Sequence, residues 1–170
     1  MQMSLLQLLS KRYSVRAYKP DEVEHEKLQL VLEAARLAPT AANRQAFRIL
    51  VVKTEGRREE LKTIYPKDWF VPPPYILGIV WVKGTEWVRR GDRKAYGELD
   101  AGIVFDHLVL EAADQGLGTC WVGAFDPDAA RSVLQLEPDW EPLAFTPLGY
   151  PAEETVRKIR KPLADLVVYR

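Results

Sequence analysis

Two groups of basic side chains at opposite ends of the chain are the first candidates for chemistry. The first twenty residues contain no acidic residue and four bases, Lys11, Arg12, Arg16 and Lys19. Residues 157–161 read RKIRK, with four bases in five positions. Because the termini of a compact domain often lie close together, the two groups can meet and form a site for a small anion. The alternative is that both are solvated surface, which is the usual role of a run of charges.

The spacing inside the first group favours phosphate as that anion. Ser14 stands midway between Arg12 and Arg16. Residues two apart face the same side of an extended segment, so these three side chains are expected to point together. Two guanidinium groups and a hydroxyl provide the donors that bind a phosphate well.

The pattern of apolar residues predicts the elements that hold these groups. Helical spacing predicts helices over residues 4–11, 24–38, 56–64, 99–115 and 126–134. Apolar runs predict strands over residues 47–53, 75–82, 117–123 and 141–149. Residues 13–19 are expected to be extended, and residues 84–97 to form a loop or a short helix. Because helices and strands do not alternate strictly, the sequence predicts an α+β fold with a central sheet flanked by helices.

Two segments are more apolar than a solvated surface requires. The predicted helix over 99–115 has almost no polar face, so it is either central or covered by a second subunit. Residues 163–169 form an apolar C-terminal tail, which we expect to be docked, with a neighbouring chain as one possible surface.

Composition narrows the class of protein. The chain has 170 residues, with 24 basic and 24 acidic side chains and a net charge of zero, which counts against nucleic-acid binding. A single cysteine, Cys120, excludes an internal disulfide framework. The longest apolar run, Tyr75 to Val82, is much shorter than the roughly 20 residues of a membrane span, and no secretory signal is visible. We therefore expect one domain over residues 1–170 in the cytoplasm.

Few side chains offer reactivity of their own. No glycine-rich dinucleotide or phosphate loop is present. The two histidines, His25 and His107, are not at metal-ligand spacing, and no bound metal is expected. Cys120 is interpreted as a small core residue rather than a nucleophile. The absence of a nucleophile or metal ligand set points to a bound organic cofactor.

Four segments in order resemble the nitroreductase family of FMN-dependent oxidoreductases. They are SKRYSVRAY at the N-terminus, APTAANRQAFRILVV from Ala38, DAGIVFDHLVLEAADQGLGTCWVGAF from Asp100, and GYPAEE with the basic run that follows it. The chain departs from the family pattern at Tyr13, where many members have a base. It also departs at Ala46 and Phe47, where proline and tryptophan are usual.

The resemblance implies a nitroreductase-like fold with a mostly antiparallel mixed sheet and an intertwined homodimer. Two FMN molecules are expected at the subunit interface. NAD(P)H would give a hydride to flavin N5, and an acceptor such as a nitroaromatic or a quinone would then replace it in a ping-pong cycle. The chemistry is expected to be carried by FMN, with no catalytic side chain.

The resemblance also implies which residues bind FMN. The expected phosphate and ribityl contacts come from both ends of the chain, namely Arg12, Tyr13, Ser14, Arg16, Lys158, Arg160 and Lys161. One edge of the ring is expected to contact a loop that contains Pro39, Thr40, Ala41, Asn43 and Gln45. Asn43 is expected to hydrogen-bond the polar edge of the ring from the partner subunit. The other expected ring contacts are Trp121, Val122 and Gly123, with a backbone N–H near N5.

Three alternatives are left open by the sequence. The protein could store or sense flavin without robust turnover, or use the same fold for reductive dehalogenation or oxidative ring modification. A nucleic-acid module with basic ends is the third, and the zero net charge counts against it. Candidate lid aromatics, with core packing as the alternative role, are Trp69, Phe70, Trp87 and Tyr96.

Overall fold

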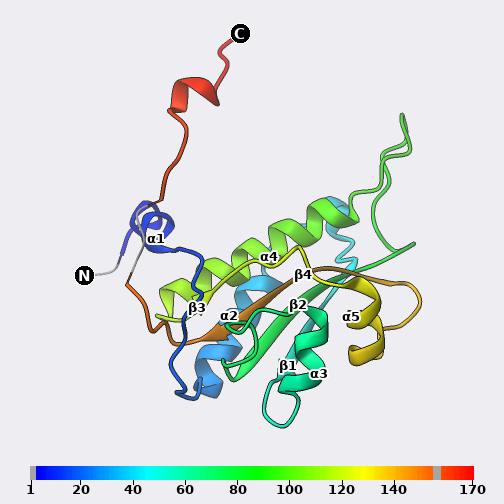
Figure 1. The fold of residues 1–170 in the computed structure, drawn as a ribbon. Coiled ribbons are helices and arrows are strands. Elements are labelled where there is room, and N and C mark those ends of the chain that lie inside the picture. Colours follow the sequence, from blue (N-terminus) through cyan, green and yellow to red (C-terminus); the bar gives the residue numbers. More distant parts are fainter. Residues whose placement is uncertain (1–2, 155–157) are drawn as a thin grey trace.

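A computed structural model describes residues 3–154 and 158–170 (Figure 1). The helices are α1 (Leu5–Lys11), α2 (His25–Arg36), α3 (Arg58–Ile64), α4 (Gly97–Asp114) and α5 (Pro127–Leu134). Short 3-10 turns form at η1 (Ala41–Asn43) and η2 (Leu163–Asp165). The strands are β1 (Phe47–Lys53), β2 (Tyr75–Val82), β3 (Gly118–Thr119) and β4 (Trp140–Gly149). Among these described helices, none has the length and apolar character to cross a bilayer.

The strands form one sheet in the order β1-β2-β4-β3, and all its ladders are antiparallel. This confirms the predicted α+β class. The one described parallel contact is a single bridge from Ser14 to Thr119, which fixes the N-terminal basic segment beside β3. The strand predicted over residues 117–123 is interrupted: regular pairing with β4 stops after Thr119 and returns only as a single bridge from Val122 to Phe145. At the interruption the Cys120 N–H donates to the Thr146 hydroxyl, at 2.9 Å, in place of a backbone carbonyl.

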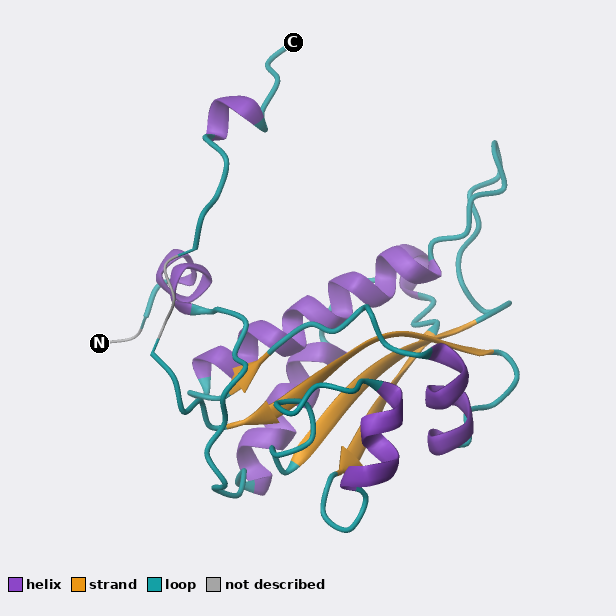
Figure 2. Cartoon of the chain, in the orientation of Figure 1, coloured by secondary structure: helices purple, strands orange, loops and turns teal. Residues whose placement is uncertain are grey.

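Helices cover both faces of the sheet (Figure 2). On one face α2 and α4 pack together over a core that includes Leu77 and Phe105. On the other face α3 and α5 enclose a second core that includes Phe70 and Phe145. Phe70 is therefore a core residue rather than a lid.

Helix α4 is the central element, as its apolar composition predicts. It contacts α1, α2 and three strands, and eight of its residues are buried. Its outer face carries Leu99, Gly102, Ile103 and Leu110 at helical spacing, with Asp106 and His107 between the last two. Leu99 is 55% exposed and the other three apolar residues are partly buried, so the helix is central on one side and only partly covered on the other.

Both ends of the chain project from this body (Figure 1). Capping by Ser4 begins α1, whose Leu5, Leu6 and Leu9 are exposed. The C-terminal tail, residues 163–170, is exposed throughout, including Leu166 and Val168. The apolar tail is therefore not docked on its own chain.

Residues 84–96 form a hairpin that projects from the start of α4, where a loop or a short helix was expected. A bridge joins Val88 to Ala95, and the Arg89 N–H donates to the Lys94 carbonyl at 2.9 Å. The rings of Trp87 and Tyr96 pack edge to face, with centroids 4.9 Å apart. These two aromatic rings pack on each other and stiffen the hairpin.

The first residue of α4 must be glycine. A Cβ on Gly97 would lie 2.1 Å from Nε1 of Trp81. We predict that Gly97→Ala lowers the free energy of unfolding by about 1–3 kcal/mol, because the indole must move. Urea denaturation measures this loss. Gly91→Ala, where a Cβ meets nothing, is the control and should change stability by less than about 0.5 kcal/mol. An equal effect of the two variants would contradict the packing argument.

Candidate functional site

The two basic groups meet in the folded chain. Lys158 donates from Nζ to the Arg12 carbonyl at 2.6 Å, and also to the Leu9 carbonyl. These carbonyls lie at the C-terminal end of α1, where backbone acceptors lack helical partners and attract a positive charge. The lysine therefore ties the C-terminal segment to the N-terminal one across most of the chain length.

This junction concentrates positive charge. Burial lowers the pKa of the Lys158 amine, and the neighbouring guanidinium groups of Arg12 and Arg160 lower it further. Within residues 3–154 and 158–170, none of these three side chains forms an ion pair with a carboxylate. Three like charges near one another without a directly paired carboxylate favour binding of an anion. Lys161 is exposed and makes no hydrogen bond or ion pair in the described chain.

The extended segment places Ser14 and Arg16 on the side opposite Val15. Val15 is buried, and its N–H donates to the Thr119 carbonyl at 2.9 Å. Successive side chains of an extended segment point to opposite sides, so those of Ser14 and Arg16 point away from the Val15 side, as their spacing predicts. Both lie near Cys120, whose thiol pKa is raised by burial against the opposing effects of Arg16 and the Ser14 hydroxyl. Cys120 is thus a buried neutral thiol, as its flanking residues indicated.

A carboxylate that sequence reasoning missed organises this segment. Glu153 accepts a hydrogen bond from the Arg16 backbone N–H at 2.6 Å. Its carbonyl accepts a second one from the Tyr13 hydroxyl at 2.7 Å. Burial raises the pKa of Tyr13, and Glu153 adds to the rise. The available signal was the acidic pair Glu153–Glu154 directly before the basic run.

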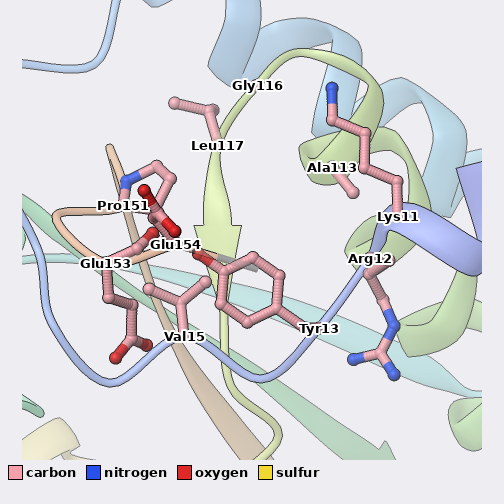
Figure 3. Close-up of a pocket in the computed structure, with 10 residues that line it drawn as sticks. All are labelled: Lys11, Arg12, Tyr13, Val15, Ala113, Gly116, Leu117, Pro151, Glu153 and Glu154. Atoms are coloured by element: carbon pink, nitrogen blue, oxygen red, sulfur yellow. Dashed lines mark hydrogen bonds between the residues drawn. The ribbon is translucent and has the colours of Figure 1, made fainter. Parts of the chain in front are cut away.

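A cavity of about 570 Å³ opens beside the junction (Figure 3). Lys11 and Arg12 stand on one side of it, Glu153 and Glu154 on the other, and Tyr13 lies between them. Of the predicted binding residues, only Arg12 and Tyr13 line this cavity. It therefore adjoins the phosphate end of the predicted site and is not the whole of it.

The guanidinium group of Arg16 lies on an aromatic ring. Its Cζ is 5.8 Å from the ring centroid of Trp69. A cation over an indole face is held by electrostatic attraction to the ring, while the group keeps its hydrogen-bond donors. Trp69 therefore packs against the second core and also supports the Arg16 guanidinium. Of its two expected roles, this matches core packing more closely than a lid.

The predicted ring-binding loop has a strained backbone. Ala42, Asn43 and Gln45 have φ angles of 50°, 51° and 51°, which non-glycine residues rarely adopt. Inside the loop, the Thr40 hydroxyl accepts from the Gln45 N–H at 3.1 Å, and the Gln45 amide donates to Asn43 Oδ1 at 3.0 Å. Pro39, Asn43 and Gln45 are exposed. Such strain is concentrated at functional sites, where it presents backbone and side-chain groups in a fixed direction.

The third predicted segment offers an open aromatic surface. Trp121 is 45% exposed and packs edge to face on Phe105, with ring centroids 4.6 Å apart. The Val122 N–H is occupied, because it donates to the Phe145 carbonyl at 2.7 Å. The donors left for a ligand in this part of the described chain are the N–H groups of Trp121 and Gly123, and a Cβ on Gly123 would meet nothing within 4 Å.

The predicted residues fall into separate regions of one chain. The Thr40–Gln45 loop contacts Asp100 in the first turn of α4, whereas the cavity beside Arg12 is lined by Ala113 near its end. At 1.5 Å per residue, these two α4 positions are about 20 Å apart. The structure therefore brings Arg12, Lys158 and Arg160 together and leaves the Thr40–Gln45 loop apart from them.

Comparison with known proteins gives concordant matches. A family model described as the nitroreductase family matches residues 9–75 and 77–150. A solved nitroreductase family protein from Clostridium difficile 630 is 33% identical, covers 98% of each chain and has a TM-score of 0.87. An FMN-dependent nitroreductase from C. difficile R20291 is 25% identical over 91% of this chain and 92% of that one, with a TM-score of 0.77. A Thermus thermophilus protein named NADH dehydrogenase is 30% identical over 94% of this chain and 93% of its own.

The charged junction predicts a pH-dependent stabilisation by anions. Inorganic phosphate should raise Tm by about 2–4 °C, which is the shift that 1 kcal/mol produces at this chain length. A bound anion favours the charged form of Lys158 and so raises its lowered pKa. Binding therefore takes up a proton only at alkaline pH, where the free amine is partly deprotonated. The gain in Tm is full below the lowered pKa and declines as pH rises above it.

Thermal melts with and without phosphate, from neutral to alkaline pH, test this prediction. In Lys158→Met the gain should be smaller and should lose its decline with pH. Lys94→Met, an exposed lysine in the distant hairpin, is the matched control and should behave as wild type. A phosphate effect that is the same in all three proteins would contradict an anion site at the junction.

Proposed function

Because this chain belongs to the nitroreductase family, we propose that it is an FMN-dependent oxidoreductase that passes a hydride from NAD(P)H to an electron acceptor. Nitroaromatics and quinones are the acceptor classes that the family resemblance favours. The observation that carries the proposal is the cluster of positive side chains without a carboxylate partner where the two ends of the chain meet. Residues 1–170 act as a single domain, and the enzyme works in the cytoplasm.

The residues of the junction fit the phosphate end of FMN. Arg12, Lys158 and Arg160 supply positive charge, of which Lys158 is held in place by hydrogen bonds, and a phosphate dianion would remove the repulsion among them. Ser14 and Arg16 add donors on the same side of the extended segment. Their task is to bind and orient the cofactor, since charge-assisted hydrogen bonds fix both position and direction.

The other two segments fit the flavin ring. Bound FMN supplies the hydride-transfer chemistry, and the chain supplies contacts around it. The Asn43 amide can bond the polar edge of the ring, with Pro39, Thr40 and Ala41 beside it. A backbone N–H of Trp121 or Gly123, directed at the position where negative charge develops, stabilises that charge without reorganisation.

The separation of these regions along α4 supports a homodimer with the site between subunits. Within one chain the loop and the basic junction lie near opposite ends of α4, so they do not face each other. If two α4 helices pack antiparallel through the partly covered row of Leu99, Gly102, Ile103 and Leu110, the loop of one protomer meets the basic junction of its partner. The apolar row then becomes buried, which accounts for its composition.

The exposed tail fits the same assembly. Strand β1 pairs on one side with β2 and is an edge of the sheet, and Val51 on this strand is 42% exposed. An open groove of about 450 Å³ lies along β1 and the end of α5. An unpaired strand edge binds another extended segment readily. In the proposed dimer, the apolar tail of each protomer, residues 163–169, binds along the β1 edge of its partner.

The proposed activity is tested on the purified protein. We expect bound FMN, reduction of its visible absorption by NADH or NADPH, and reoxidation by a nitroaromatic or a quinone. A flavin that dithionite reduces but neither nicotinamide reduces would contradict the enzyme and favour a storage or sensor role. Consumption of a halogenated acceptor alone would favour dehalogenation on the same fold.

Arg16→Ala should weaken FMN binding by about 1.5–3 kcal/mol, the usual contribution of a hydrogen bond to a charged group. Equilibrium dialysis measures the affinity, and urea denaturation of the flavin-free protein should change little. Lys19→Ala, an exposed lysine in the same segment, is the control and should bind FMN as wild type does. Unchanged affinity in Arg16→Ala would falsify the phosphate role of this residue.

A chain that ends at Pro162 should dimerise much more weakly. We expect the dimer dissociation constant to rise by at least about 100-fold, because burying even two apolar side chains contributes about 3 kcal/mol or more. Sedimentation equilibrium measures the constant, and a chain lacking only Arg170 is the control. A wild-type chain that sediments as a folded 19.4 kDa species would count against the whole assembly.

A further inference from the structure

A buried carboxylate at the start of α4 holds the predicted ring-binding loop. Asp100 is 3% exposed, and both of its oxygens accept from the Ala41 backbone N–H, at 3.0 and 3.1 Å. Buried acids are rare unless a cation or several donors compensate them. In the described chain Asp100 forms no ion pair, and the Ala41 N–H is the donor described for its carboxylate.

The loop needs an external support because its own backbone opposes its shape. Three of its residues, Ala42, Asn43 and Gln45, have left-handed φ angles without being glycine. The other hydrogen bonds described for residues 40–45 are local, within residues 40–47. Asp100 therefore provides the one described hydrogen bond that ties this loop to a distant part of the chain.

The support comes from a rigid element. Helix α4 packs against α2 and the sheet, and Trp81 closes on the backbone of its first residue, Gly97. A charge-assisted hydrogen bond from such a helix is stronger and more directional than a neutral one. The hydrogen bond is made at Ala41, the second residue of the loop. It therefore fixes the direction of the turn that follows, which contains Asn43.

We propose that Asp100 is a positioning residue that locks the Thr40–Gln45 loop in its strained form and so directs the Asn43 amide toward the flavin ring. The second half of this statement rests on the proposed function. The first half concerns the chain alone and can be tested without flavin. Asp100 touches neither the reacting atoms nor, in this assignment, the cofactor.

A different role for an acid at this position is to stabilise the helix through its dipole. Asp100 shares the first turn of α4 with Glu98, which is exposed and forms no hydrogen bond in the described chain. Dipole stabilisation applies to both acids. Glu98→Gln is therefore the matched control, because it removes a first-turn charge without touching the loop.

Cleavage by trypsin after the exposed Arg44 reports how firmly the loop is held. The full-length chain is digested as purified and after flavin removal, and the fragment beginning at Gln45 is quantified. We expect Asp100→Ala to speed this cleavage by about 10- to 100-fold, the effect of losing a hydrogen bond to a charged group. Asp100→Asn, which keeps one acceptor oxygen, should restore most of the protection, and Glu98→Gln should match wild type.

A second variant removes the donor instead of the acceptor. Thr40 is extended, at φ −132° and ψ 156°, which suits a residue before proline, and Ala41 is the first residue of a 3-10 turn. Ala41→Pro thus deletes the N–H with little backbone strain. If this bond is the cause, Ala41→Pro should expose Arg44 as Asp100→Ala does, and combining Asp100→Asn with Ala41→Pro should be no worse than Ala41→Pro alone.

FMN affinity and the visible absorption band of the bound flavin complete the test. We expect Asp100→Ala to weaken FMN by about 10-fold or more and to alter the band, with rescue by Asp100→Asn. Unchanged cleavage at Arg44 overturns the proposal, as does a loosened loop with unchanged flavin affinity and spectrum. If wild type binds no FMN yet the variants loosen the loop, the proposed function fails while the Asp100 tie stands.

Discussion

Repulsion among positive side chains that the fold forces together is the constraint on which the site depends. Lys158 is fixed on the carbonyls at the end of α1, and this fixes it beside Arg12 and Arg160. Lys158 cannot leave this position without breaking the contact between the two ends of the chain. An anion bound there would relieve the repulsion and would strengthen that contact, so anion binding and the contact would be coupled.

Helix α4 determines the distance between the Thr40–Gln45 loop and the cavity beside Arg12. Its buried side joins the sheet to α2, its first turn holds the Thr40–Gln45 loop, and its last turn borders the cavity beside Arg12. Because the two candidate regions lie at opposite ends of one rigid helix, their distance within a chain is fixed. The proposed homodimer would bring the loop of one chain to the basic junction of the other and would cover the partly exposed apolar row on α4.

Sequence patterns predicted most of the elements, because periodic burial leaves a strong signal. The basic residues were also found, since four bases without an acid are visible in any reading of residues 1–20. Other features depend on single long-range contacts. Neither the hydrogen bond from the Arg16 N–H to Glu153 nor that from the Ala41 N–H to Asp100 follows from local spacing. The helix over 97–114 contains five acids, and their spacing does not tell which one is buried. The length of strand β3 was overestimated, because the Cys120 N–H donates to the Thr146 hydroxyl instead of to a backbone carbonyl of β4.

The contact between Arg16 and Trp69 links the surface of the molecule to its interior. The Arg16 guanidinium lies over the indole ring, with its Cζ 5.8 Å from the ring centroid. Trp69 in turn packs against the second core. A ligand that drew the guanidinium away from the ring would break this cation–π contact and would change the electric field at the edge of that core.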